Sequence, residues 1–309
     1  MPNALPPLAL APILRPMPWG SERWLVSDMP GAESLVSGGA LAGTSLRALM
    51  ETRAGELLGP VPPAEGGRFP LLFKLIEARE RLSVQVHPDG PAALRLGRGA
   101  RPKAEGWHLL GAAPGAELVL GLAPGVDRTE LEAALRRGAL EPLLGRSPAR
   151  AGDFVYLPAG LLHALGGGIS LLELQQASDT TYRVHDWNRP GLDGRPRALH
   201  LEEALEAIDF GLRGPAPFAA PTSGRPGLRC PWFELERIEF RAGEGLALEA
   251  GLPRVLACLE GALALEGGPC LGPGEVALVP AAAAARISAA GRAVGLLGTA
   301  LIPGEGARR

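Results

Sequence analysis

The segment GDFVYLPAGLLH, residues 152–163, aligns without gaps on GEVALVPAAAAA, residues 274–285, and this repeat relates the two halves of the chain. A glycine, an acidic residue and a proline recur at the same offsets in both copies. Each copy predicts a tight turn, a strand and a second turn, which presents one residue on the inner face of a β-barrel. That residue is His163 in the first copy and Ala285 in the second. We therefore expect two similar β domains, of which the second lacks this histidine.

The sequence around the repeat divides the chain into two domains. Residues 212–228 are rich in Gly and Pro and are predicted to form a linker. From about residue 231 the chain alternates short apolar runs with Gly and Pro turns, which is typical of an all-β domain. We expect domains at 1–215 and 229–309. The predicted fold class is mainly β, with two jelly-roll barrels and a few helices inserted in and flanking the first.

Two helices are predicted from the spacing of apolar residues. The first covers 129–144, where Thr129 is the expected N-cap and Glu132 completes a capping box. The second covers 200–210 and ends at Gly211. We expect the first helix to serve as a scaffold.

The stretch FPLLFKLIEARERLSVQVH, residues 69–87, predicts two strands joined by a polar turn at 79–81. In the second strand, apolar residues alternate with Ser83, Gln85 and His87. Because side chains of a strand point alternately to opposite faces, Gln85 and His87 are expected to share a face.

Composition excludes several classes of function. The chain has 309 residues, 46% of them hydrophobic, and a formal net charge of −2, so it carries no general basic field for nucleic acid. Its apolar start is interrupted by prolines and predicts a poor signal peptide, and no apolar run reaches membrane-spanning length. The thiols of Cys230, Cys258 and Cys270 form no C-x-x-C motif and are expected to be reduced, in a cytoplasmic protein.

Rare polar residue types gather in one window of the sequence. Lys74 and Lys103 are the only lysines among 31 basic residues, and the glutamines are Gln85, Gln175 and Gln176. Where arginine replaces lysine almost everywhere, a remaining lysine suggests a site that needs a compact ammonium group. Two lysines fall this close together by chance often enough that only their coincidence with the other rare types carries weight.

The first copy of the repeat also fits the pattern G-x5-P-x-G-x2-H, through Gly152, Pro158, Gly160 and His163. This pattern resembles the second signature of cupin barrels. The first cupin signature usually offers H-x-H followed by a glutamate, and this chain has Gln85-Val86-His87 and then Glu105. Two imidazoles, one carboxylate and one amide can hold a divalent metal with open positions for a substrate.

Longer strings resemble the successive motifs of type I phosphomannose isomerases, in particular the short bacterial form. They are FPLLFKLIEARERLSVQVHPD (69–89), KAEGW (103–107), GDFVYLPAGLLHALGGGISLLELQQASDTTYRVHDWNR (152–189) and HLEEALEAIDF (200–210). The resemblance implies a metal-dependent isomerase that interconverts mannose 6-phosphate and fructose 6-phosphate through an enediolate. It further implies one Zn²⁺ per chain, in domain 1–215, whereas domain 229–309 would lack metal ligands.

The same resemblance implies roles for individual residues. Lys103, Asp179 and Arg183 match the catalytic residues, with Lys103 and Arg183 placed to stabilise the enediolate. Which group transfers the proton stays open, since Lys103 can shuttle it and Asp179 can serve ring opening. The implied zinc ligands are Gln85, His87, Glu105 and His163.

Substrate-binding residues are expected on the elements beside this site. Lys74 meets either the phosphate of the substrate or a carboxylate such as Glu173, and Trp19 lines a sugar pocket or belongs to the core. The predicted set is Lys74, Ser83, Glu173 and Trp19.

Two other classes of function remain as alternatives. Two histidines and one glutamate also form the facial triad of non-haem iron oxygenases, although Lys103, Arg183 and the glutamine in place of a histidine argue against it. The second alternative is a protein that binds a sugar phosphate without converting it. The expected partner is a small-molecule sugar phosphate, with no nucleic acid and no membrane, and the oligomeric state stays open.

Overall fold

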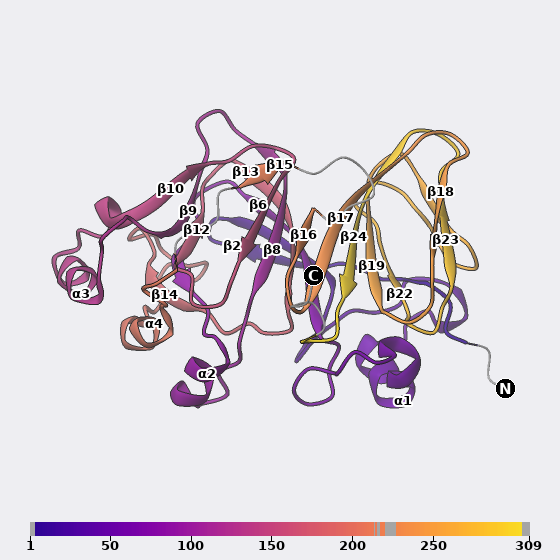
Figure 1. The fold of residues 1–309 in the computed structure, drawn as a ribbon, viewed down its shortest axis with the longest axis horizontal. Coiled ribbons are helices and arrows are strands. Elements are labelled where there is room, and N and C mark those ends of the chain that lie inside the picture. The colour runs from indigo at the N-terminus through magenta and orange to yellow at the C-terminus, as the bar shows by residue number, and fades with distance from the viewer. Residues whose placement is uncertain (1–3, 213, 215–216, 220–226, 305–309) are drawn as a thin grey trace. The chain divides into compact units, whose positions relative to one another are not determined.

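Strand β1 (Leu8–Ala9) pairs antiparallel with β22 (Val276–Val279), so the beginning and the end of the chain share a sheet. The computed structural model, shown in Figure 1, describes residues 4–212, 214, 217–219 and 227–304. It divides into two compact units. The terminal unit draws on residues 1–13, 23–74 and 220–309, and the central unit on 14–22 and 75–219.

The central unit contains two antiparallel sheets. The five-stranded sheet has the order β10-β9-β12-β7-β14, and the seven-stranded sheet has the order β15-β11-β8-β13-β6-β3-β2. Two of these strands belong to this unit only in part: residues 20–22 of β3 and residues 75–78 of β6. The bounds are β2 Ile13–Met17, β3 Gly20–Val26, β6 Leu71–Ala78, β7 Val84–Val86, β8 Glu105–Ala112, β9 Glu117–Leu122, β10 Leu144–Pro148, β11 Asp153–Leu157, β12 His163–Leu165, β13 Ile169–Gln176, β14 Tyr182–His185 and β15 Phe218–Ala219.

Side chains from both of these sheets share one apolar core. Leu109 and Leu171 come from β8 and β13, whereas Leu118 and Leu165 come from β9 and β12, and all four are buried in the same cluster. Burying the apolar face of each sheet against the other removes both from water, which is the main stabilising term in such a sandwich.

The terminal unit repeats this arrangement. Its sheets have the orders β1-β22-β19-β24-β17-β16 and β18-β23-β20-β21, around a second apolar cluster, and a short pair β4-β5 lies apart from them. The bounds are β4 Asp28–Met29, β5 Ala32–Glu33, β16 Leu228–Arg229, β17 Phe233–Phe240, β18 Gly245–Leu248, β19 Arg254–Glu260, β20 Leu263–Leu265, β21 Cys270–Leu271, β23 Ala285–Ser288 and β24 Ala293–Ala300.

The structure confirms the repeat found in the sequence. In both copies a glycine with positive φ opens the turn before the strand, Gly152 at 91° and Gly274 at 83°. The strands β11 and β22 follow, and the next strands, β12 and β23, begin at His163 and Ala285. The order β11-β8-β13-β6 in one unit therefore corresponds to β22-β19-β24-β17 in the other.

Four helices occur in the described part of the chain: α1 (Leu46–Leu58), α2 (Gly90–Leu96), α3 (Arg128–Arg137) and α4 (Leu201–Ala207). Residues of α3 and α4 pack on the outer face of the five-stranded sheet, where Leu131 and Ala204 join Val86 in one buried cluster. The predicted cap of α3 was wrong. Asp127, not Thr129, is the N-cap, because its side chain accepts a hydrogen bond from the amide of Glu130 at 2.8 Å. The helix also ends earlier than expected, at Gly138 in the left-handed conformation.

The prediction of a mainly β fold is confirmed, although the sheets remain separate rather than closed into barrels. The first 74 residues divide between the two units, and the domains expected at 1–215 and 229–309 stay a prediction. The predicted linker, 212–228, contains β15, and its residues 213, 215–216 and 220–226 lie outside the described residues.

Two further findings concern the whole described chain. No described helix has both the length and the apolar character needed to cross a membrane. Cys230 and Cys258 are buried, Cys270 is exposed, and all three are free thiols.

Candidate metal centre

Three strands of the central unit bring the predicted metal ligands together. Gln85 lies in β7, and His87 follows directly after this strand. His163 is the first residue of β12 and stands opposite Gln85 in the antiparallel pair β12–β7, so both side chains project from the same face. Glu105 begins β8, in the facing sheet. The site therefore lies between the two sheets.

The ligand atoms of His87, Glu105 and His163 all lie within 4.8 Å of one another. The Nε2 of His87 is 3.1 Å from Oε1 of Glu105, and the Nε2 of His163 is 3.7 Å from its Oε2. All three side chains are at most 2% exposed. Two imidazoles and one carboxylate thus converge on a small volume from which water is excluded.

Backbone carbonyls fix which nitrogen of each imidazole faces the cluster. The Nδ1 of His87 lies 2.8 Å from the carbonyl oxygen of Thr180, and the Nδ1 of His163 lies 2.9 Å from that of Leu161. Since a carbonyl only accepts, each Nδ1 carries the proton in the neutral ring, and the lone pair is on Nε2. Both lone pairs therefore face Glu105.

Burial keeps these imidazoles neutral. Desolvation, reinforced by the positive charge of Lys103, lowers the pKa of His87 to about 3. Burial also lowers the pKa of His163. For Glu105, burial alone would raise the pKa, but the positive charge of Lys103 holds it well below its usual value. The cluster therefore presents two neutral nitrogens and one carboxylate, the protonation states that bind a metal.

The arrangement fits a divalent cation. Among the described residues, neither Nε2 of His87 nor Oε2 of Glu105 has a hydrogen-bond partner, although both atoms are buried. Such orphaned acceptors are costly unless a ligand satisfies them. A cation bound between the two side chains would satisfy both atoms, whereas without one the lone pair on Nε2 of His87 and Oε1 of Glu105, 3.1 Å apart, repel each other.

Gln85 stands at the edge of this cluster. Its Nε2 lies 3.4 Å from Nε2 of His163, and its Oε1 accepts a hydrogen bond from the hydroxyl of Ser83 at 3.2 Å. A half-turn of the amide would direct its oxygen at the cluster instead. Gln85 as a metal ligand stays a prediction, as does the role of Ser83 in binding substrate.

Two of the predicted catalytic residues lie beside the cluster. Lys103 is 4% exposed, and its Nζ lies 2.6 Å from Oε1 of Glu105. Arg183 stands opposite Gln85 in the pair β14–β7, so its side chain leaves the sheet on the same face. Its Nη1 donates to the carbonyl of Ala198 at 3.3 Å, and burial lowers its pKa.

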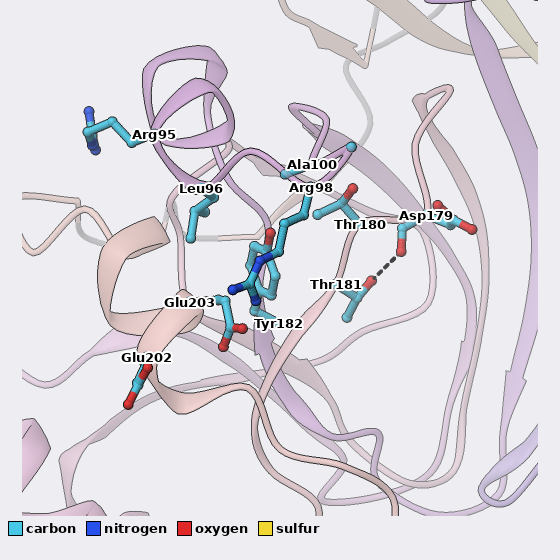
Figure 2. A pocket seen from close by; sticks show the side chains of 11 residues that line it. Arg95, Leu96, Arg98, Ala100, Asp179, Thr180, Thr181, Tyr182, Glu202 and Glu203 are labelled. Atoms are coloured by element: carbon cyan, nitrogen blue, oxygen red, sulfur yellow. Dashed lines mark hydrogen bonds between the residues drawn. The ribbon is translucent and has the colours of Figure 1, made fainter.

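Asp179 lies apart from the ligands, on an exposed turn between β13 and β14. It lines a pocket of about 570 Å³ together with Thr180, Thr181 and Tyr182. Figure 2 shows Arg98 and Glu203 beside Tyr182, whereas the carboxylate of Asp179 points away from them. The backbone oxygen of Asp179 accepts a hydrogen bond from Thr181 at 3.2 Å. The catalytic role of Asp179 stays a prediction.

The remaining predicted substrate residues are buried. Glu173 accepts a hydrogen bond from the indole of Trp107 at 2.8 Å, and Trp19 is 3% exposed within the apolar core of the central unit. The Nζ of Lys74 lies 5.4 Å from the centre of the Trp24 ring. These positions leave their roles in substrate binding as predictions.

Sequence reasoning did not identify Thr180 and Leu161, whose carbonyl oxygens orient the two histidines. Every residue carries a carbonyl, so no residue type signals this role. The only signal was positional, since Leu161 lies within the repeat and Thr180 within the string SDTTYR.

Comparisons with known proteins agree with this site. Residues 14–104 match the family described as phosphomannose isomerase type I, catalytic domain. The mannose-6-phosphate isomerase of Streptococcus mutans is 38% identical over 218 residues, which cover 71% of this chain and 63% of that protein. Mannose-6-phosphate isomerase ManA of Bacillus subtilis is 35% identical over 219 residues, which cover 66% of this chain and 68% of that protein. The aligned region thus spans about two thirds of these curated relatives.

A solved structure is similar over almost the whole chain. The crystal structure of mannose 6-phosphate isomerase from Bacillus subtilis superposes with a TM-score of 0.81 at 28% identity. It covers 95% of this chain and 99% of that one, so the agreement includes both units. On these similarities in sequence and structure, the chain belongs to the type I phosphomannose isomerase family.

Proposed function

We propose that this protein is a metal-dependent aldose–ketose isomerase that interconverts mannose 6-phosphate and fructose 6-phosphate. The observation that carries the proposal is the buried cluster of His87, Glu105 and His163, with Lys103 paired to Glu105. The named activity of the similar proteins gives the substrate. An aldose–ketose exchange moves a proton between C1 and C2 and places negative charge on two neighbouring oxygens, so the site must stabilise an oxyanion.

We further propose that the cation is zinc, held by His87, Glu105 and His163, with Gln85 as a fourth ligand. Two histidines and one glutamate form a ligand set of known catalytic zinc sites, which keep a position open for substrate. A bound zinc ion supplies Lewis-acid polarisation of the carbonyl and hydroxyl oxygens without a change of redox state. The carbonyls of Thr180 and Leu161 would hold both imidazoles in the ligating tautomer.

Cationic side chains provide the rest of the electrostatic stabilisation. Lys103 lies at the ligand Glu105, so its ammonium group can reach an oxygen of a sugar bound there. Arg183 shares the face of Gln85, and its Nε has no hydrogen-bond partner among the described residues, which leaves a donor available. Each such donor contributes about 3 kcal/mol to stabilising a developing oxyanion. The pocket that Asp179 lines contains none of the proposed ligands, so the role of Asp179 in ring opening stays a prediction.

The test is turnover of mannose 6-phosphate, measured by a coupled assay of the fructose 6-phosphate formed. We expect activity in the protein as purified, loss after treatment with a chelator, and recovery when zinc is restored. Metal-dependent turnover by Fe²⁺ with consumption of oxygen, and no isomerisation, would instead indicate an oxygenase. Binding of mannose 6-phosphate to metal-loaded protein without any product would indicate a binding protein, and either result contradicts the proposal.

A further inference from the structure

Gln175 is fully buried in β13 and has no part in the proposed chemistry. It stands opposite the ligand Glu105 in the pair β13–β8. Its Nε2 donates to two carbonyl oxygens, those of Gln176 at 2.9 Å and Ser178 at 2.6 Å. Because both partners are acceptors, the amide nitrogen must be the atom that faces them. Gln175 therefore closes the turn that follows its own strand.

That turn carries the partner of a metal ligand. The hydroxyl of Ser178 accepts a hydrogen bond from the amide of Thr180 at 3.2 Å, which fixes the next residues of the turn. The carbonyl of Thr180 then accepts from Nδ1 of His87 at 2.8 Å. A continuous path of hydrogen bonds thus leads from the amide of Gln175 to the imidazole of His87.

The same turn is bonded to the segment that precedes Glu105. Gln176 exchanges two hydrogen bonds with Ala104: its Oε1 accepts from the Ala104 amide at 3.0 Å, and its own amide donates to the Ala104 carbonyl at 3.2 Å. Arg101 is bonded twice as well, since its amide donates to the Thr180 hydroxyl at 3.1 Å and its carbonyl accepts from the Ser178 hydroxyl at 3.3 Å. The turn at 176–180 therefore sets the position of His87 relative to Lys103 and Glu105.

We propose that Gln175 and Ser178 are positioning residues, which hold the 176–180 turn so that the Thr180 carbonyl orients His87 toward the metal. The inference rests on the metal centre of the proposed function. Partners that orient a ligating histidine contribute strongly to metal affinity, because an imidazole free to rotate loses binding energy when it is fixed by the metal. The hydrogen bonds of the Gln175 amide nitrogen and of the Ser178 hydroxyl go to the turn and to Arg101, so the turn is the route by which they reach His87.

The first experiment measures zinc affinity by competition with a chromophoric chelator. Gln175→Met keeps the length of the side chain and removes the donor, and Ser178→Ala removes the hydroxyl. We expect each variant to bind zinc about 10- to 100-fold more weakly than the original protein. The visible absorption of the Co²⁺-substituted protein should change with Gln175→Met, because the geometry of the His87 ligand changes.

A matched control comes from the other copy of the fold. Thr299 is 5% exposed and stands opposite Arg254 in β24–β19, the position that corresponds to Gln175 opposite Glu105. Thr299→Val therefore removes a buried polar group at the equivalent site. We expect zinc affinity to be unchanged in this variant.

A second measurement needs no metal. Long-range ¹H–¹⁵N spectra of the chelator-treated protein report the tautomer of each histidine. We expect the proton on Nδ1 of His87 in the original protein and a mixture of tautomers in Gln175→Met, with His163 unchanged because its partner is Leu161. This result separates positioning of His87 from a general loss of stability.

A double-mutant cycle tests the path through His87. In the His87→Gln background, Gln175→Met should cost little further zinc affinity. Equal zinc affinity of Gln175→Met and Ser178→Ala with the original protein would overturn the inference while leaving the metal centre intact. The inference would also be overturned if Gln175→Met lowered zinc affinity in the His87→Gln background as much as it does in the original protein. An original protein that binds no divalent metal would overturn both this inference and the proposed function.

Discussion

The ammonium group of Lys103 lies 2.6 Å from the carboxylate of Glu105, and both side chains are almost completely buried. Glu105 is also within reach of both imidazoles, so one carboxylate serves the Lys103 ammonium group and the proposed metal at the same time. The two positive charges share this carboxylate, and removing one changes the binding of the other.

Lys103→Met should lower kcat/KM about 10²- to 10³-fold, because a donor to the developing oxyanion is lost. The same substitution should strengthen zinc binding, since Glu105 no longer shares its charge with an ammonium group. Steady-state kinetics and chelator competition measure the two effects. Arg146→Met, which removes exposed ion pairs to Glu117 and Glu141, is the control and should change neither. Weaker zinc binding in Lys103→Met would contradict the argument.

His87→Gln and His163→Gln should each remove most of the bound zinc, because each deletes a ligand nitrogen from a buried cluster. His185→Gln provides the matched control. His185 packs edge-on against Trp187, with ring centres 4.9 Å apart, and lies outside the cluster. Metal content after gel filtration decides the outcome, and retention of zinc by both cluster variants would exclude the proposed ligand set.

The chelator-treated protein should lose stability as the pH falls below about 6.5. The unfolded chain takes up a proton on His87 near the ordinary pKa of 6.5, whereas burial in the folded protein lowers this pKa to about 3. The unfolded state therefore binds more protons in this window, and the free energy of unfolding should fall by about 2 kcal/mol between about pH 7.5 and pH 5 from this group alone. Glu105, whose folded pKa is lowered, adds to the loss at lower pH.

Urea unfolding of the metal-free protein across this range measures the effect. His87→Gln lacks the imidazole, so its stability should depend less steeply on pH. An identical slope in the two proteins would show that His87 is not the group that titrates.

Ala285→His should not create a second metal site. The residue would occupy the position of His163, but the register places Leu248 opposite it where Gln85 stands in the central unit. Arg254, paired with Val279, takes the position of Glu105 and would repel a cation. We expect one zinc per chain in this variant by elemental analysis, and a second equivalent would refute the correspondence.

The elements that carry the site were predictable where side-chain patterns determine them. The alternation around Gln85 and the repeat that ends at His163 predicted two strands and the face they share, and the structure places Gln85 and His163 opposite each other. The rarity of lysine in this composition singled out Lys103, whose ammonium group forms an ion pair with Glu105. Periodicity and composition were informative here because burial on one face constrains both.

Features that depend on distant backbone were not predictable. Asp127 and Thr129 are both good N-caps, and the choice between them depends on where the chain enters the helix. The pairing of β1 with β22 was not predictable, because β1 is only two residues long and depends on β22 for its sheet. Thr180 acts through its backbone carbonyl, so the type of its side chain does not predict this role.

The interleaved terminal unit has a consequence for how the protein is made. Besides the pairing of β1 with β22, the amides of Ala281 and Ala282 bond to the carbonyls of Leu57 and Glu56 in the last turn of α1. During synthesis the ribosome releases β1 and α1 long before it releases their partners. The central unit has all its residues once residue 219 has emerged, so it can fold while translation continues, whereas the terminal unit can be completed only after the last strands emerge. In this protein, the proposed metal centre would fold before the chain as a whole.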